Sequence, residues 1–182
     1  MLKRLIITGP NGAGKSHLAA RLAAVRPDVP VISFDAMKLT SHWRQRSRAL
    51  IEADLSRAVQ ADSWIIEGGP SLLPFAINRA DSVMWMDPPE WLRAWRLIAR
   101  PLRNIGRTRK ELPQGNVDWP WQQYKFAMRS IRNRTNFRTK ISAQLAANPG
   151  LRVWRIRNSA DVSSAIDEWR GVVDGVDPWA LS

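Results

Sequence analysis

The stretch GPNGAGKS, residues 9–16, constrains the fold more than any other part of this 182-residue chain. It matches the pattern G-x-x-x-x-G-K-[ST] at Gly9, Gly14, Lys15 and Ser16. An apolar, β-rich run (LKRLIIT, 2–8) precedes it, and a strong helix former (HLAARLAAV, 17–25) follows it. A glycine-rich turn between a strand and a helix directs backbone N–H groups around phosphate oxygens, and the helix N-terminus adds positive potential. The pattern therefore predicts a phosphate site on an α/β fold.

Each residue type in this motif has a defined part in holding a nucleoside triphosphate. The lysine, Lys15, reaches the β and γ phosphates, and the hydroxyl of Ser16 can ligate Mg²⁺. We therefore expect ATP and Mg²⁺ as cofactors, with nucleotide contacts from Gly9, Asn11, Gly12, Ala13, Gly14, Lys15, Ser16 and His17. The alternative is a glycine turn with a solvated lysine, which the flanking strand and helix disfavour.

Short apolar runs alternate with helical stretches along the chain. Strands are expected at 2–8, 30–35, 63–69, 81–87 and 151–156. Helices are expected at 17–25, 46–61, 119–147 and 160–173, with a long basic helix from Glu90. This alternation is typical of a parallel sheet covered on both faces, and the length favours one α/β domain, 1–182, with a frayed tail at about 174–182.

Composition restricts the class of protein and its partners. No apolar run approaches the roughly 20 residues that span a bilayer, and the chain has no cysteine, so we expect a cytoplasmic protein without membrane contact. The net charge of +12 is local, because residues 93–157 carry +14 and the rest of the chain −2. A polyanionic partner is expected: nucleotide phosphates, nucleic acid, or both.

Acidic residues follow three predicted strands, at the sheet edge where such folds bind ligands. Asp35 ends the second strand and could accept the proton of an acceptor hydroxyl, hold a magnesium-bound water, or cap the next helix. Glu67 follows the apolar run WII, where a magnesium-organising carboxylate is expected; the alternative is an ordinary loop acid. Asp87 precedes two prolines, and we expect it to end its strand and cap the next helix, outside the site.

An arginine stripe marks the helix expected from Glu90, with a spacing of three or four residues: Arg93, Arg96, Arg100, Arg103 and Arg107. The stripe covers an arc of about 80° on an ideal helix, although Pro101 is expected to kink it. Apolar residues occupy the other side: Trp91, Trp95, Ile98, Leu102 and Ile105. No acid stands between Glu90 and Glu111, so these like charges need an anion. We therefore expect a lid at about 90–118 that closes over the phosphates; the alternative is a solvated charged face.

Tryptophan is abundant, with ten in this chain. Trp64 and Trp85 fall in predicted strands and are expected in the core. Trp43, Trp119 and Trp121 could wall an acceptor site by stacking on a ring, or they could pack the lid against the core. Neither of the two histidines has a partner at metal-ligand spacing, so a zinc site is not expected.

Taken together, five blocks resemble a known group: the phosphate loop, VISFD, WIIEGG, DSVMWMD and the W-x-x-x-W-R-x-x-x-R-x-x-R helix. Over about residues 2–170 the chain is similar to the adenylate-kinase-like P-loop proteins of the DNA-topology-modulation type. The resemblance implies a nucleoside-monophosphate-kinase-like three-layer sandwich, with a five-stranded parallel sheet in the order 2-3-1-4-5 and an arginine-rich helical lid. It also implies catalytic roles for Lys15, Asp35, Arg96, Arg100 and Arg103. The chain departs from the family pattern at Glu67-Gly68-Gly69-Pro70, where the family commonly has Asp-Gly-Asn-Tyr.

Two functional hypotheses follow. The first is a kinase that moves the γ-phosphoryl of Mg-ATP to a small acceptor such as a nucleoside or a nucleotide. If Asp35 is a base, the acceptor group is a hydroxyl, because a phosphate acceptor needs none. The second is a nucleic-acid-associated NTPase or polynucleotide kinase that uses the basic segment 93–157. The acceptor and the choice between monomer and dimer stay open.

Overall fold

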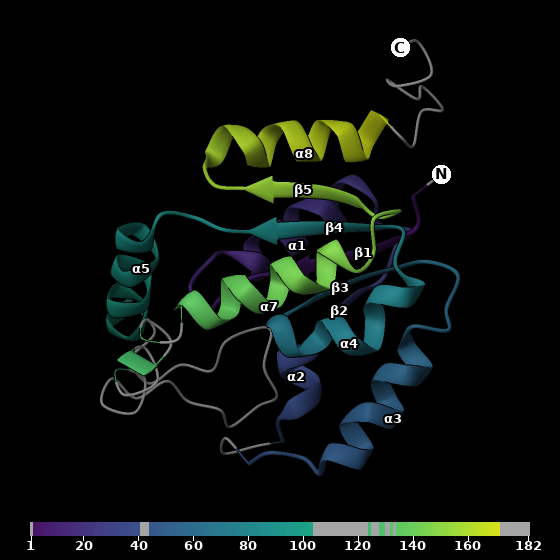
Figure 1. Cartoon of the computed structure of the whole chain (residues 1–182), viewed down its shortest axis with the longest axis horizontal. Helices are drawn as coiled ribbons and strands as arrows, with labels where there is room; N and C mark the ends of the chain where they lie inside the picture. Colours follow the sequence, from purple (N-terminus) through teal and green to yellow (C-terminus); the bar gives the residue numbers. More distant parts are fainter. Residues whose placement is uncertain are drawn as a thin grey trace.

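Five parallel strands form one sheet in the order β2-β3-β1-β4-β5 (Figure 1). The strands are β1 (Arg4–Thr8), β2 (Val31–Ser33), β3 (Trp64–Gly68), β4 (Ser82–Met86) and β5 (Arg152–Ile156). The structure is a computed structural model that describes residues 2–40, 44–103, 124, 128–129, 132 and 134–171. The predicted α/β fold and the strand order implied by the resemblance are confirmed.

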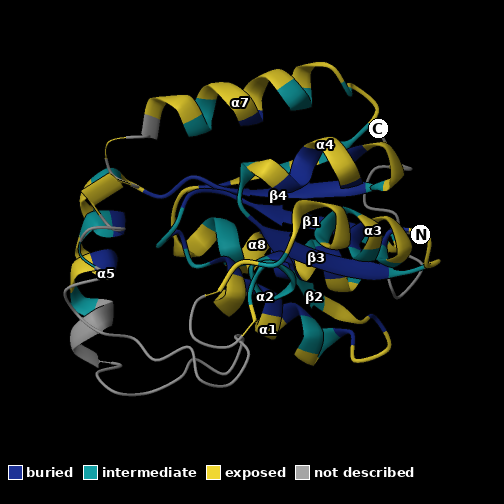
Figure 2. Ribbon diagram, turned by 90° about the horizontal axis from the view of Figure 1, so that it is seen from below, coloured by how far each residue is buried: buried dark blue, intermediate teal, exposed yellow. Residues whose placement is uncertain are grey.

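The three central strands are buried because helices cover both faces of the sheet (Figure 2). Ile6 of β1 lies between Ile66 of β3 and Val83 of β4, and all three side chains are fully buried. The edge strands β2 and β5 are partly exposed. The sequence therefore shows continuous apolar runs only where a strand has neighbours on both sides.

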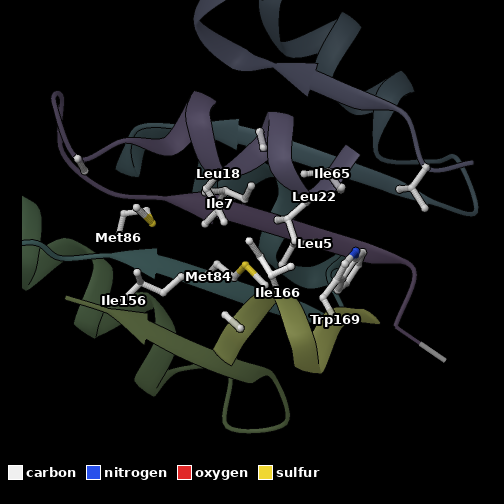
Figure 3. Close-up of a cluster of buried hydrophobic side chains, with 14 residues drawn as sticks. Leu5, Ile7, Leu18, Leu22, Ile65, Met84, Met86, Ile156, Ile166 and Trp169 are labelled. Atoms are coloured by element: carbon white, nitrogen blue, oxygen red, sulfur yellow. The ribbon is translucent and has the colours of Figure 1, made fainter. Parts of the chain in front are cut away.

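Successive side chains of a strand point to opposite faces, and the core divides accordingly. Leu5 and Ile7 pack on the face covered by α1 (Lys15–Val25) and α8 (Ser159–Gly171), in a cluster that contains the buried Trp169 (Figure 3). The opposite face carries Ile6, Trp64 and Trp85, as expected of those tryptophans. Helices α3 (Arg48–Ala58), α4 (Leu73–Ala76) and α7 (Arg134–Ala146) contribute Leu55, Leu73 and Ile141 to that second cluster.

Strand β2 is shorter than the predicted run 30–35. It ends at Ser33, whose hydroxyl accepts a hydrogen bond from the backbone N–H of Ala36 and so caps α2 (Phe34–Lys38). The apolar residues Ile32 and Phe34 favour a strand, but the serine cap starts a helix between them. Asp35 therefore lies in the first turn of a helix and does not end a strand.

Other helices were predicted in part or missed. Helix α5 (Glu90–Arg103) begins where predicted, after two prolines, and stands at the carboxyl edge of the sheet (Figure 1). The 3₁₀ turns η2 (Pro70–Leu72) and η3 (Ile77–Arg79) flank α4, in a segment where no helix was predicted. The remainder of the expected lid, the expected tail and three tryptophans (Trp43, Trp119 and Trp121) lie outside the described residues. No described helix is long and apolar enough to cross a membrane.

Candidate active site

The loop from β1 to α1 has the backbone conformation that a phosphate cradle requires. Gly9, Gly12 and Gly14 have φ values of 148°, 79° and 100°, which side chains rarely tolerate. A Cβ atom on Gly9 would overlap the carbonyl oxygen of Met86, and one on Gly12 would lie 2.8 Å from Cγ of Leu97. Strand β4 at Gly9 and helix α5 at Gly12 lie so close to the loop that only backbone fits there. Without side chains at these positions, the backbone N–H groups of the loop can turn toward a ligand.

Lys15 is the first residue of α1, and its side chain is almost fully buried. Its Nζ donates a hydrogen bond to the carbonyl oxygen of Pro10 at 3.2 Å, so the ammonium group lies back over the loop. Burial of an ammonium group is costly unless polar atoms surround it, and the loop carbonyl is one such atom. The next two residues, Ser16 and His17, are exposed at the start of the helix.

Replacement of Gly9 by alanine is expected to destabilise the loop by about 2 kcal/mol or more, because the new methyl group meets backbone and the φ value is unfavourable. Gly69 offers a matched control: it lines the same cavity, has an ordinary φ of −73° and has no atom within 4 Å of an added Cβ. Urea unfolding of Gly9→Ala and Gly69→Ala measures both changes. Equal stability of the two variants would contradict the role given to Gly9.

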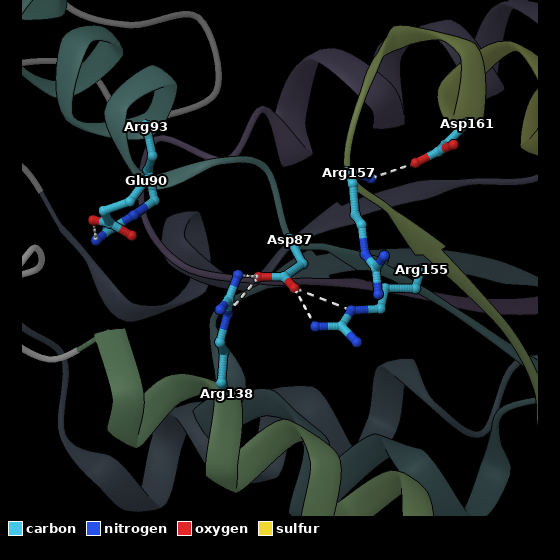
Figure 4. Close-up of polar contacts among 7 residues, drawn as sticks. All are labelled: Asp87, Glu90, Arg93, Arg138, Arg155, Arg157 and Asp161. Carbon is cyan, nitrogen blue, oxygen red and sulfur yellow. Dashed lines mark hydrogen bonds and ion pairs between the residues drawn. The ribbon is translucent and has the colours of Figure 1, made fainter.

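A cavity of about 1850 Å³ lies along the carboxyl edge of the sheet, and the phosphate loop forms part of its lining. The sequence-predicted site residues that line it are Gly9, Asn11, Gly12, Ala13, Gly14, Lys15, Ser16, His17, Asp35, Glu67 and Arg96. Further walls come from α7 and from the turn between β5 and α8. The turn is held by Asp161 of α8, which accepts hydrogen bonds from the backbone N–H of Arg157 at 2.7 Å (Figure 4) and from that of Asn158 at 3.2 Å. The fold therefore brings three of the predicted groups, loop, carboxylates and arginine, to one cavity.

Asp35 is held by a neighbouring lysine. Its carboxylate accepts a hydrogen bond from Nζ of Lys38 at 3.1 Å, and 44% of its side chain is exposed. The ammonium group of Lys38 also lies 4.0 Å from the centre of the Phe34 ring. Of the three roles considered for Asp35, the capping role is wrong, because Ser33 caps α2. The carboxylate of Asp35 is thus partly exposed at the cavity wall, beside the ammonium group of Lys38.

Glu67 is buried at the end of β3, with only 3% of the residue exposed. One carboxylate oxygen accepts a hydrogen bond from the hydroxyl of Ser33 at 2.7 Å. Within the described ranges no three His, Cys, Asp or Glu side chains lie together as a metal-binding group. Mg²⁺ on a nucleotide needs no such group, since it commonly takes one or two protein oxygens and completes its shell with phosphate oxygens and water. The hydroxyl of Ser16 and the carboxylate of Glu67 are ligands of that type.

Helix α5 rests on the phosphate loop through its arginine-bearing face. Arg96 donates from Nη1 to the carbonyl oxygen of Ala13 at 3.1 Å, and Arg93 donates to that of Asn11 at 3.3 Å. Arg93 is fully buried and is paired with Glu90 (Figure 4). An acid from the first turn of α5 therefore neutralises the first arginine of the stripe, which was expected to need an external anion.

The apolar side of α5 is exposed at Trp91, Trp95 and Ile98. The amphipathic pattern predicted two faces correctly, but the part of α5 buried against the loop consists of Arg93 from the basic face together with Leu97, and Arg96 reaches the loop from an exposed position. Loop carbonyls explain this orientation, because they accept guanidinium N–H groups and apolar side chains cannot satisfy them. The backbone of Arg100 and Arg103 belongs to α5, and their side chains lie outside the described part of the structure.

Asp87 does not have the expected helix-capping role. The carboxylate is buried after β4 and accepts hydrogen bonds from Arg138 of α7 at 2.8 Å and from Arg155 of β5 at 2.6 Å (Figure 4). The Arg155 guanidinium also lies 4.4 Å from the centre of the Trp85 ring. One carboxylate therefore joins the end of β4 to an edge strand and to a helix that lines the cavity.

Replacing both arginines that pair with Asp87 is expected to lower the free energy of unfolding by more than the sum of the two single replacements. Arg138→Gln and Arg155→Gln should each lower the free energy of unfolding by about 1 kcal/mol, because one guanidinium remains on the carboxylate. The double variant should lose about 3 kcal/mol or more, because the buried carboxylate then has no cation. Urea unfolding measures this coupling. Arg152, which pairs with Glu168, is the control: Arg138→Gln combined with Arg152→Gln should be additive. Additivity in the first pair would contradict the shared role of Asp87.

Several cavity residues carry no recognisable signal in the sequence. Lys38 and Ser71 lie near Asp35, and α7 contributes Phe137, Lys140 and Gln144 to the wall. Their spacing of three and four residues places the α7 residues on one helix face. That pattern is common in any helix, so only the fold shows that this face meets a cavity.

Comparisons with known proteins show the fold. No protein-family model matches the chain, and no curated protein matches it. The crystal structure of shikimate kinase from Bacteroides thetaiotaomicron is similar at 18% identity and a TM-score of 0.54, with 96% of this chain and 99% of that chain covered. Shikimate kinase from Acinetobacter baumannii, in complex with shikimate, is similar at 13% identity and a TM-score of 0.53, with coverages of 96% and 94%.

Both solved structures support the P-loop, nucleoside-monophosphate-kinase-like fold over nearly the whole chain. At such identities the likeness concerns the fold alone. Both are shikimate kinases, so the finer resemblance to the DNA-topology-modulation type stays a prediction.

Proposed function

We propose that this chain is an ATP-dependent phosphotransferase that moves the γ-phosphoryl group of Mg-ATP to a small acceptor. The observation that carries the proposal is a single cavity in which a phosphate loop meets two carboxylates, Asp35 from the first turn of α2 and Glu67 from the end of β3. A phosphate loop alone binds a nucleotide. The two carboxylates beside it would supply what transfer also needs, a metal-organising group and a base.

The donor half of the cavity comprises the loop, the start of α1 and α5. Lys15 lies over the loop, where it would contact the β and γ phosphates. Ser16 and Glu67 would hold Mg²⁺, which neutralises charge on the phosphate oxygens. Arg96 donates to the loop itself and is close enough to turn its guanidinium toward a bound phosphate. Arg100 and Arg103, farther along the same helix, are proposed to clamp the migrating group.

The acceptor half lies around Asp35. Its carboxylate would accept the proton of the attacking hydroxyl, and the hydrogen bond from Lys38 orients it. The same cavity is lined by polar groups and an aromatic ring, from Ser71, Lys140, Gln144 and Phe137. Such walls suit a small polar molecule with at least one hydroxyl group, for example a nucleoside, a nucleotide or another hydroxyl compound. The similar structures are named for a small acceptor, shikimate, which supports an acceptor of this size.

The nucleic-acid hypothesis is weaker, since acids from outside the basic segment already pair with four of its described arginines. Arg93 is paired with Glu90, Arg152 with Glu168, and both Arg138 and Arg155 with Asp87. Those acids lie outside segment 93–157 in the sequence, so a local charge count misses them. A phosphate backbone would have to compete with these pairs.

A phosphoryl-acceptor screen with γ-labelled ATP tests the proposal. Nucleosides, nucleotides, small hydroxyl compounds and oligonucleotides are offered separately, with Lys15→Ala as the inactive control. We expect label in a small molecule and none in the control. Label in an oligonucleotide, with binding that weakens by orders of magnitude between low and moderate salt, would overturn the small-acceptor proposal in favour of the nucleic-acid hypothesis.

A further inference from the structure

We propose that Ser33 is a positioning residue that couples the metal-organising carboxylate of Glu67 to the base Asp35. The inference rests on the proposed function, because it concerns the same two carboxylates. No role was predicted for Ser33, since a serine in a predicted strand has no distinguishing signal. Its hydroxyl group is nevertheless the point at which two parts of the site meet.

Two hydrogen bonds fix the direction of the Ser33 hydroxyl group. An ionised carboxylate can only accept, so the Ser33 O–H donates to Oε1 of Glu67, at 2.7 Å. A lone pair of the same oxygen accepts the backbone N–H of Ala36, at 3.4 Å. The backbone N–H of Ala36 thus donates to the serine hydroxyl, and the serine hydroxyl donates to the buried carboxylate of Glu67. Loss of the hydroxyl would interrupt both contacts at once.

The backbone places these residues side by side independently of their side chains. Ser33 and Glu67 are partners in the parallel pairing of β2 and β3. One residue further along, Phe34 lies so close to Gly68 that a Cβ on the glycine would be 2.9 Å from the Phe34 Cβ. The start of α2 and the end of β3 are therefore packed together at two consecutive positions. A side-chain bond at this junction holds atoms that the backbone already brings close.

Burial makes the Ser33 bond important for Glu67. Glu67 is only 3% exposed. A buried carboxylate that loses a hydrogen-bond donor has an unfavourable desolvation free energy, or it turns toward other donors. Asp35 follows the cap by two residues, so a change in the first turn of α2 moves its carboxylate too. Ser33 therefore acts on both carboxylates without needing to touch nucleotide or acceptor.

The experiment compares four variants in the full chain: Ser33→Ala, Ser33→Thr, Ser47→Ala and Glu67→Gln. Threonine keeps the hydroxyl and is also a good N-cap residue. Ser47 is the matched control, because it caps α3 through the same kind of bond, at the same 3.4 Å from the Leu50 N–H, away from either carboxylate. The readout is the affinity for Mn²⁺ in the complex with ADP, measured by electron paramagnetic resonance, together with kcat and the KM for ATP.

Ser33→Ala is expected to weaken Mn²⁺ binding by about 10- to 100-fold, as is usual when the hydrogen-bond partner of a metal ligand is removed. We expect a lower kcat with little change in affinity for metal-free ADP. Ser33→Thr should restore most of the Mn²⁺ affinity, and Ser47→Ala should leave it within about twofold of the wild type. If Ser33→Ala does not fold, Ser33→Cys replaces it, since a thiol is a weak donor of similar size and should also weaken binding.

The outcomes separate this inference from the proposed function. If Ser33→Ala and Ser33→Cys bind Mn²⁺ as the wild type does while Glu67→Gln loses it, the role of Ser33 is wrong and the metal role of Glu67 stands. If Glu67→Gln also binds Mn²⁺ normally, the metal assignment fails and the inference fails with it. If Ser47→Ala weakens Mn²⁺ binding as much as Ser33→Ala does, the effect comes from general destabilisation, and the coupling is overturned.

Discussion

Replacement of Lys15 by alanine is expected to lower kcat/KM for ATP by about 10³-fold or more, the largest effect of any single change in this chain. The ammonium group lies over the phosphate loop, beside the carbonyl oxygen of Pro10, where bound phosphate would place its negative charge. Lys15 is only 6% exposed in the folded loop, so water has little access to take over the role of the lost positive charge. The measurement is steady-state ATP turnover in the presence of acceptor, with nucleotide affinity by calorimetry.

The control for Lys15→Ala is Lys3→Ala, which removes an exposed lysine outside the cavity. It should retain wild-type turnover. Thermal unfolding of both variants shows whether the loop variant is folded at the assay temperature. Wild-type turnover in folded Lys15→Ala would remove the phosphate-loop assignment.

Replacement of Asp35 by asparagine is expected to lower kcat by about 10³-fold while the affinity for ATP stays within about twofold. Asparagine preserves the size of the side chain and removes its ability to accept a proton. The donor half of the cavity does not include Asp35, so nucleotide binding has no reason to change. Parallel measurements of kcat and ATP affinity separate the two effects.

Asp54→Asn is the matched control for Asp35→Asn. Asp54 lies on α3, is also paired with a cation (Arg46, at 2.6 Å), and has 31% of its side chain exposed against 44% for Asp35. Its replacement should leave kcat unchanged. An unchanged kcat in Asp35→Asn would exclude the role of base and would favour an acceptor that attacks through a phosphate oxygen, for which no base is needed.

Local sequence patterns predicted the scaffold well, because they depend on neighbouring residues. The phosphate loop, the five strands and the start of α5 each carry their signal within about ten residues. The limits of β2 were wrong because two local preferences compete there. Ile32 and Phe34 favour a strand, and Ser33 followed by Asp35 favours a helix start, which the structure adopts.

The candidate site was predicted less completely, because its contacts join residues that are far apart in the chain. Arg138 and Arg155 reach Asp87 across 51 and 68 residues, and no local pattern links them. The same holds for the bond from Ser33 to Glu67 across 34 residues. Helical periodicity gave α5 a basic and an apolar face, but which face would meet the loop depended on the loop carbonyls.

The assignment as a small-molecule phosphotransferase is tested most directly by comparing how much labelled phosphoester and how much labelled inorganic phosphate the protein forms from γ-labelled ATP. The protein is incubated with γ-labelled ATP and a pool of small hydroxyl metabolites, and ADP, labelled phosphoester and labelled inorganic phosphate are quantified together. Transfer to an acceptor predicts equal amounts of ADP and labelled phosphoester, with inorganic phosphate at the level of the Lys15→Ala control. ADP matched by inorganic phosphate alone, whatever small acceptor is present, would contradict the assignment of this chain as a small-molecule phosphotransferase.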